Sequence, residues 1–135
     1  MDGFFYKQNN RKQLNVLGGE LEECRASLDN RTIVTGFYRD NCCNTGPDDF
    51  GLHTVCCIMT KSFLEYSSLV GNDLSTPIPE YNFKGLSEGD KWCLCASRWQ
   101  EAFEAGKAPN VILKSTNIAT LSVINLEDLK KYSVN

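Results

Sequence analysis

The stretch that decides the fold is Gly89-Asp90-Lys91-Trp92-Cys93-Leu94-Cys95-Ala96-Ser97-Arg98-Trp99, where the apolar period changes from strand-like to helix-like. Over residues 91–96 the alternation predicts a strand with two faces, one carrying Trp92 and Leu94 and the other Cys93 and Cys95. Ser97, followed by Gln100 three residues later, is typical of a capping box, so we expect a helix to begin there. The stretch therefore predicts a strand that passes directly into a helix.

The rest of the chain predicts further short elements on both sides of this stretch. We expect strands over residues 14–17, 31–38, 53–59, 111–113 and 120–124, and helices over 61–70 and 126–132. The order is too irregular for repeated βαβ units. This order predicts an α+β single domain over residues 14–135, with about three short helices. Its sheet is expected to be mixed or largely antiparallel and curved, with a barrel-like sheet as the alternative. Residues 1–13 are expected to form a poorly ordered extension.

Composition narrows the classes of function. The chain has 135 residues and a net charge of −3, so it lacks the basic field that nucleic-acid binding needs. It has no apolar run long enough to span a membrane and no signal-peptide pattern, which predicts a cytoplasmic protein whose thiols stay reduced. Open strand edges are compatible with a homodimer. Seven cysteines nevertheless make the chain cysteine-rich.

Three segments are expected to converge into a functional surface: the turn-rich loop 40–53, the loop 72–79 and the strand–helix junction 93–98. The polar side chains near them are the predicted ligand-binding residues, namely Arg39, Asn72, Asp73, Asp90 and Arg98. For Asp73 and Asp90 the alternative is structural, because short acidic side chains in turns commonly accept hydrogen bonds from backbone amides.

Thiol chemistry is predicted for Cys42, Cys43, His53 and Cys95. A cation, a base or a helix N-terminus can each favour a reactive thiolate. Cys42 and Cys43 follow an arginine, Cys95 precedes the expected helix, and His53 is a candidate base. Strict alternation over 53–59 places His53 and Cys56 on opposite faces, unless His53 still belongs to the loop.

A metal site is an alternative use of the same side chains. Cys93 and Cys95 share a strand face and, with His53, offer ligands that suit zinc or iron. The cysteine spacings are Cys-Cys, Cys-Cys and Cys-Leu-Cys, without the C-x₂-C pair of structural zinc sites. No cofactor is therefore favoured, and buried inert thiols are the other interpretation of Cys56, Cys57 and Cys93.

Several sequence blocks match one known family. They are Asn15-Val16-Leu17-Gly18, Thr35-Gly36-Phe37-Tyr38-Arg39-Asp40, Thr45-Gly46-Pro47, Gly51-Leu52-His53-Thr54-Val55-Cys56, Gly71-Asn72-Asp73-Leu74-Ser75-Thr76-Pro77 and Gly89-Asp90-Lys91-Trp92-Cys93-Leu94-Cys95-Ala96. With these blocks the chain, from about residue 14 to 132, resembles the Domain of Unknown Function 2237 family of small, mainly bacterial proteins. The resemblance implies one self-contained domain and no established activity, cofactor or partner. Asn117 stands where the family usually has histidine after Thr116, which argues against a site built on two histidines. Cys57 stands where alanine is usual, which implies core packing.

Two functions stay open from the sequence. The first is a binding module for a small molecule or a protein, with a pocket lined by cysteine, histidine and aspartate. The second is a cysteine- or metal-dependent enzyme that uses Cys42, Cys43, His53 and Cys95. Whether the protein is an enzyme at all is left undecided by these patterns.

Overall fold

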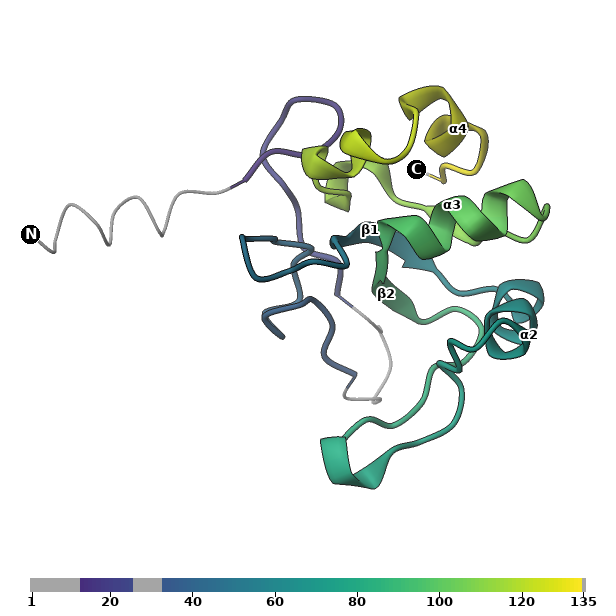
Figure 1. Ribbon diagram of the computed structural model, residues 1–135. Helices are drawn as coiled ribbons and strands as arrows, with labels where there is room; N and C mark the ends of the chain where they lie inside the picture. The colour runs from purple at the N-terminus through teal and green to yellow at the C-terminus, as the bar shows by residue number, and fades with distance from the viewer. Residues whose placement is uncertain (1–12, 26–32, 135) are drawn as a thin grey trace, which may run out of the picture.

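The computed structural model describes residues 13–25 and 33–134, and in this part of the chain three strands form one antiparallel sheet. Strand β1 (His53–Ile58) lies in the centre, β2 (Lys91–Cys95) on one side and β3 (Asn110–Val111) on the other (Figure 1). The sheet is open, because β2 and β3 do not pair with each other within the described residues. The α+β class and the largely antiparallel sheet are confirmed, without the barrel-like closure. Of the expected extension, residues 1–13, residues 1–12 lie outside the described part, and the Gln13 side chain is hydrogen-bonded to the Thr45 backbone.

The helices and the sheet enclose one apolar core. The α-helices are α2 (Lys61–Leu69), α3 (Ala96–Glu104) and α4 (Leu126–Lys131). Alternate residues of β1 and β2, Val55, Cys57, Trp92 and Leu94, pack with Phe63, Trp99 and Leu129 of these helices. In Figure 1 the loops that precede β1 lie to the left of β1 and β2, while α2, α3 and α4 lie to the right and above. Of the two predicted strand faces, the one carrying Trp92 and Leu94 therefore builds the core.

Helix starts show how local chemistry sets the elements. The Thr60 hydroxyl accepts a hydrogen bond from the Phe63 N–H and caps α2, as the sequence indicates. The capping box predicted at Ser97 is wrong, because α3 already begins at Ala96 and Cys95 is its N-cap residue, without a side-chain cap bond. The Ala96 N–H instead donates to the Leu52 carbonyl, 2.9 Å away. β2 thus enters α3 without an intervening turn.

Two of the expected strands are absent. Residues 33–38 form a loop, and residues 31–32 of that prediction lie outside the described residues. Over 118–122 a 3₁₀-helix replaces the expected strand, and the Asn117 side chain caps it by accepting from the Ala119 N–H. Residues 14–17 contribute only isolated bridges, one joining Asn15 to Asn117. Side-chain hydrogen bonds thus take the place of ladder pairing at these positions.

Candidate functional site

A pocket of about 440 Å³ lies along the edge strand β2, between the 36–39 turn and the start of the 72–74 segment. Its lining includes six of the residues predicted to form sites: Arg39, His53, Asn72, Cys93, Cys95 and Arg98. Phe37, Leu74 and Trp92 add apolar walls. Each of the three segments expected to converge contributes to this lining, but the loop 40–53 does so only through His53, and the preceding residues 36–39 take the place expected for the rest of it.

His53 is held in one orientation by its neighbours. Its Nδ1 atom lies 2.7 Å from a carboxylate oxygen of Asp49, and its backbone N–H donates to the other oxygen at 3.0 Å. The ring stacks on Phe37 with centroids 5.7 Å apart, and a Cβ placed on Gly51 would lie 2.8 Å from the ring. Asp49 is 2% exposed, and the Thr45 hydroxyl donates to it as well. Because Nδ1 is engaged, the Nε2 atom is the ring nitrogen left for chemistry.

A register shift brings His53 beside Cys95. The β1–β2 pairing matches Cys56 with Cys93 but, after an irregularity between His53 and Val55, matches His53 with Cys95. Cross-strand partners share a face of the sheet, so His53 lies on the same face as Cys56. The strict alternation that separated these two residues is therefore wrong at this position. The Sγ atom of Cys95 lies 3.2 Å from the Ser97 hydroxyl oxygen.

The two arginines of the pocket are positioned differently. Arg39 has a positive φ of 57°, donates to the Gly36 carbonyl at 2.5 Å and stacks over the Trp92 ring with its Cζ atom 5.5 Å from the ring centroid. Arg98, in the first turn of α3, lies 3.3 Å from the Glu101 carboxylate. A non-glycine residue in the left-handed region costs conformational energy, which the stacking and the hydrogen bond offset.

The remaining predicted residues lie outside this pocket. The Asp73 carboxylate accepts from the Ser75 N–H and the Thr76 hydroxyl, which lowers the pKa of Asp73. Asp90 is buried and accepts from the Ser87 N–H. These bonds match the turn-forming alternative for both aspartates. Cys42 is half-buried in the loop before β1.

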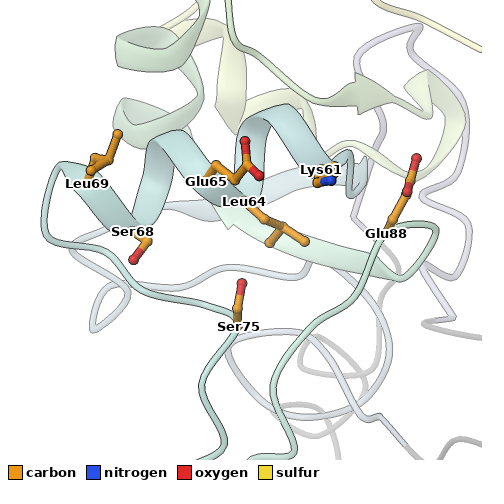
Figure 2. A pocket seen from close by; sticks show the side chains of 7 residues that line it. All are labelled: Lys61, Leu64, Glu65, Ser68, Leu69, Ser75 and Glu88. Atoms are coloured by element: carbon orange, nitrogen blue, oxygen red, sulfur yellow. The ribbon is translucent and has the colours of Figure 1, made fainter.

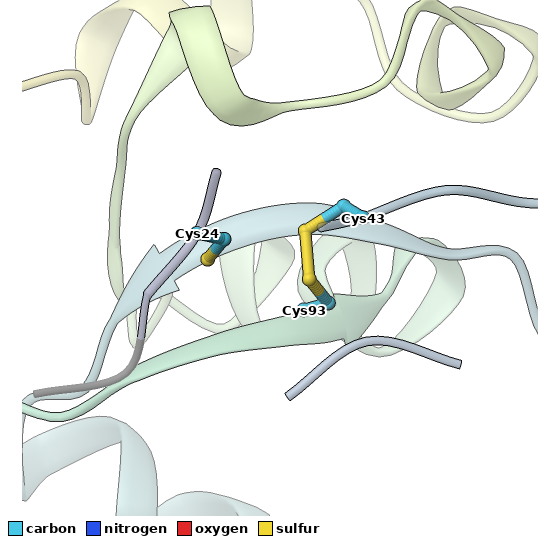
Figure 3. Close-up of side chains that lie close together, drawn as sticks. All are labelled: Cys24, Cys43 and Cys93. Atoms are coloured by element: carbon cyan, nitrogen blue, oxygen red, sulfur yellow. A yellow bond between two sulfur atoms is a disulfide. The ribbon is translucent and has the colours of Figure 1, made fainter. Parts of the chain in front are cut away.

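Four of the seven cysteines form two disulfides, Cys24–Cys56 and Cys43–Cys93. The reduced, inert thiols predicted for Cys56 and Cys93 are therefore wrong. Cys57 keeps its thiol and packs fully buried in the apolar core, so the core-packing interpretation is confirmed for it. Burial raises the pKa of the Cys57 thiol well above its usual value. Figure 3 shows the Cys24 sulfur beside the Cys43–Cys93 disulfide.

Some residues that hold the pocket and its loops in place could hardly be recognised from the sequence. Asp49 was one of several acidic residues in a turn-rich loop, and only its place four residues before His53 hinted at a pair. Thr35 read as part of a strand, but its hydroxyl accepts the Cys93 N–H at 2.8 Å along the edge of β2. The Asn117 side-chain amide donates to the Cys43 carbonyl and so holds the loop that carries Cys43.

A second, larger pocket of about 740 Å³ lies beside α2 (Figure 2). Figure 2 shows Ser75 and Glu88 across from the Lys61, Leu64 and Glu65 side chains of the helix. None of these residues belongs to a predicted site, and the lining mixes one lysine with two carboxylates. The edge-strand pocket is therefore the candidate functional site.

Comparison with known proteins adds the family but no activity. Among residues 13–25 and 33–134, no helix is long and apolar enough to cross a bilayer. No curated protein matches the chain. A family model described as an uncharacterized protein conserved in bacteria matches residues 14–133. The chain therefore belongs to the DUF2237 family.

Proposed function

We propose that the edge-strand pocket binds a small organic anion, which makes this chain a small-molecule binding module. The charge of the lining carries the proposal. The whole chain has a net charge of −3, yet the pocket is lined by Arg39, Arg98 and His53 and, among the residues that the structure describes, by no carboxylate. A pocket with cations in an otherwise acidic protein concentrates anions at that place.

The backbone favours the same kind of ligand. Cys95 caps α3 without using its side chain, so the first N–H groups of a nine-residue helix carry a partial positive charge beside the pocket. Arg98 projects from that same first turn. Guanidinium groups hydrogen-bond carboxylates and phosphates in a planar, two-pronged way, which gives orientation as well as affinity.

The size and walls of the pocket suit a small molecule. Its volume of about 440 Å³ falls in the usual range for ligand sites. The Trp92 and Phe37 rings offer apolar surface to the body of a ligand, while the Asn72 amide is a neutral group able to donate and accept hydrogen bonds. The proposed ligand therefore carries a carboxylate or phosphate on a compact, partly apolar body.

Thermal unfolding with inorganic phosphate and with a panel of mono- and dicarboxylates tests the proposal. A bound anion raises the Tm in a concentration-dependent way. Arg39→Ala and Arg98→Ala should each weaken binding by at least about tenfold, the loss expected for a charge-assisted hydrogen bond. Arg25→Ala is the matched control, because Arg25 is exposed and pairs with Glu23 outside the pocket. Equal affinities for the pocket variants and the control would refute the proposal.

A second candidate is cysteine-dependent chemistry in the same pocket. It is favoured by the order Asp49, His53, Cys95, in which a buried carboxylate fixes the imidazole and the register places the thiol opposite it. This arrangement has the roles of a nucleophile, a base and an orienting group. Under this reading, Asp49→Asn should slow alkylation of Cys95 by iodoacetamide and change its pH profile. Unchanged rate and profile would remove the enzyme reading and leave the binding module.

A further inference from the structure

The two disulfides meet at one point of the sheet. Cys56 and Cys93 are direct partners in the β1–β2 register, and each bonds to a cysteine from a preceding loop, Cys24 or Cys43. The sulfur atoms of Cys24, Cys43 and Cys93 all lie within 4.8 Å of one another (Figure 3). All four cysteines are at most 2% exposed and form a cluster separate from the main core. Four sulfurs thus share one buried site.

Hydrogen bonds hold this site independently of the S–S bonds. The Cys56 N–H donates to the Thr116 hydroxyl at 3.1 Å, and the Cys93 N–H to the Thr35 hydroxyl at 2.8 Å. Each N–H therefore points away from the facing strand, as in the close, non-hydrogen-bonded type of antiparallel pair.

The two loop cysteines are also tied through their backbones. The Cys24 N–H donates to the Asn41 carbonyl at 2.7 Å, and the Cys43 carbonyl accepts from the Asn117 side chain at 3.0 Å. All four backbones are thus anchored by bonds that reduction leaves in place. Reduction of both disulfides would leave four thiols in one buried cluster.

We propose that these four cysteines, when reduced, bind one zinc ion, so that a zinc–tetrathiolate centre and the two disulfides are alternative states of one site. Zinc takes four thiolates in a tetrahedron with Zn–S bonds of about 2.3 Å, which needs sulfurs roughly 3.8 Å apart. Three of the four sulfurs, those of Cys24, Cys43 and Cys93, already lie within 4.8 Å of one another, which is about 1 Å more than that spacing, and the Cys56 sulfur is bonded to that of Cys24. This ligand set shares only Cys93 with the set predicted from the sequence, and Cys95 and His53 take no part in it.

The interconversion balances in electrons and protons. A dithiol or phosphine reductant supplies four electrons, both S–S bonds break, and four protons complete four thiols. Zinc then displaces the four thiol protons as it binds the thiolates. In the reverse direction a disulfide oxidant takes four electrons, both S–S bonds form again, and zinc leaves. The proposal does not depend on an anion occupying the edge-strand pocket.

Cobalt and zinc binding to the full chain tests the proposal. The chain is reduced anaerobically with a phosphine, and Co²⁺ is added as a spectroscopic probe. We expect one equivalent of Co²⁺ with the absorption of a tetrahedral thiolate site, displaced by one equivalent of Zn²⁺. The oxidised chain should bind none at this site. Absence of binding to the reduced chain would overturn the proposal.

Substitutions assign the ligands. Cys24→Ser and Cys43→Ser should each weaken binding by about a hundredfold, as expected when one of four thiolates is lost. Cys57→Ala and Cys95→Ser are matched controls, one and two residues from the ligands Cys56 and Cys93, and should bind as the wild type does. Full binding by Cys43→Ser, or its loss in Cys95→Ser, would overturn the assignment.

If the variants fail to fold, a measurement on the wild-type chain still tests the proposal. Alkylation with and without zinc, followed by mass spectrometry, should show that zinc protects Cys24, Cys43, Cys56 and Cys93 of the reduced chain. If zinc protects none of the four, the proposal fails whatever the variants do.

Discussion

Removal of the Cys43–Cys93 disulfide should destabilise the protein strongly. The bond joins residues 50 positions apart, and a cross-link of that span restricts the unfolded chain by about 4 kcal/mol in the chain-entropy estimate. The change to make is Cys43→Ala with Cys93→Ala, because alanine leaves no unpaired thiol. Since whole domains are stable by roughly 5–15 kcal/mol, this one bond is a large share of the total.

Urea unfolding of the oxidised proteins at 25 °C measures the effect. Fluorescence is a suitable signal because Trp99 is fully buried and Trp92 is 8% exposed, so both change environment on unfolding. We expect the double variant to unfold with a free energy about 4 kcal/mol lower than that of the wild type. Its m-value should rise, because the unfolded chain without the cross-link exposes more surface.

The control repeats both measurements with a reductant and a chelator present. The wild type then lacks the same bond and cannot be rescued by metal, so the two proteins should differ by less than about 1 kcal/mol, the contribution of sulfur packing. A loss below about 1 kcal/mol in the oxidised comparison, or a difference that persists after reduction, would refute the chain-entropy reasoning.

Three further predictions concern single positions. Gly36 has a φ of 99° and a Cβ there would lie 2.5 Å from a backbone carbonyl oxygen, whereas one on Gly89, φ 93°, would meet nothing within 4 Å. Gly36→Ala should therefore lower the free energy of unfolding by at least about 1 kcal/mol more than Gly89→Ala, and equal losses would contradict the steric argument. In the native state Cys57 should react with iodoacetamide far more slowly than the partly exposed Cys95, because burial raises the pKa of Cys57 and blocks access; comparable rates by mass spectrometry would be inconsistent with this. The pKa of Asp73 should lie below its ordinary value of 3.8 in an NMR titration, so the stability it contributes is present above that value and is lost as the pH falls through the lowered pKa; a pKa at or above 3.8 would contradict the hydrogen bonds drawn to it.

Elements with strong local signals were predictable from the sequence. The strand beginning at His53, the helix capped by Thr60, the strand around Cys93 and the last helix all form close to the expected residues. Each combines a clear apolar period with capping or turn residues at its ends, so the local preference agrees with the tertiary structure. Membership of the family was also predictable, because several short sequence blocks typical of it occur in the expected order.

The missing strands at Thr35 and Thr120 have one physical cause, which is competition from side-chain hydrogen bonds. Thr35 lies in a β-branched run, but its hydroxyl accepts a hydrogen bond from the Cys93 N–H at the edge of β2. Its own N–H donates to the Asn41 side chain. Thr120 lies in another apolar run, but its hydroxyl bonds the buried Thr54 hydroxyl at 2.7 Å and the chain coils there. Such long-range bonds leave no local periodicity to detect.

The sulfur pairing was equally out of reach from the sequence. Seven cysteines permit many pairings, and nothing in their spacing selects Cys24 for Cys56 or Cys43 for Cys93. The selection comes from the register of β1 and β2, which is a tertiary fact. The cytoplasmic location and the homodimer stay predictions from the sequence.

Cys93 connects the sulfur cluster to the pocket. Its side chain closes the disulfide to Cys43, and the same residue lines the edge-strand pocket beside Cys95. Arg39 lies four residues before Cys43, and its side chain is held by the Gly36 carbonyl and the Trp92 ring. The bond between Cys43 and Cys93 therefore limits how far that guanidinium can move from the pocket. A zinc ion bound by the same two sulfurs would keep a link between them, whereas four uncoordinated thiols would leave only the hydrogen bonds of the backbone to hold the loop. Under the zinc proposal, the redox and metal state of the cluster therefore changes how tightly the loop that follows Arg39 is restrained beside the pocket.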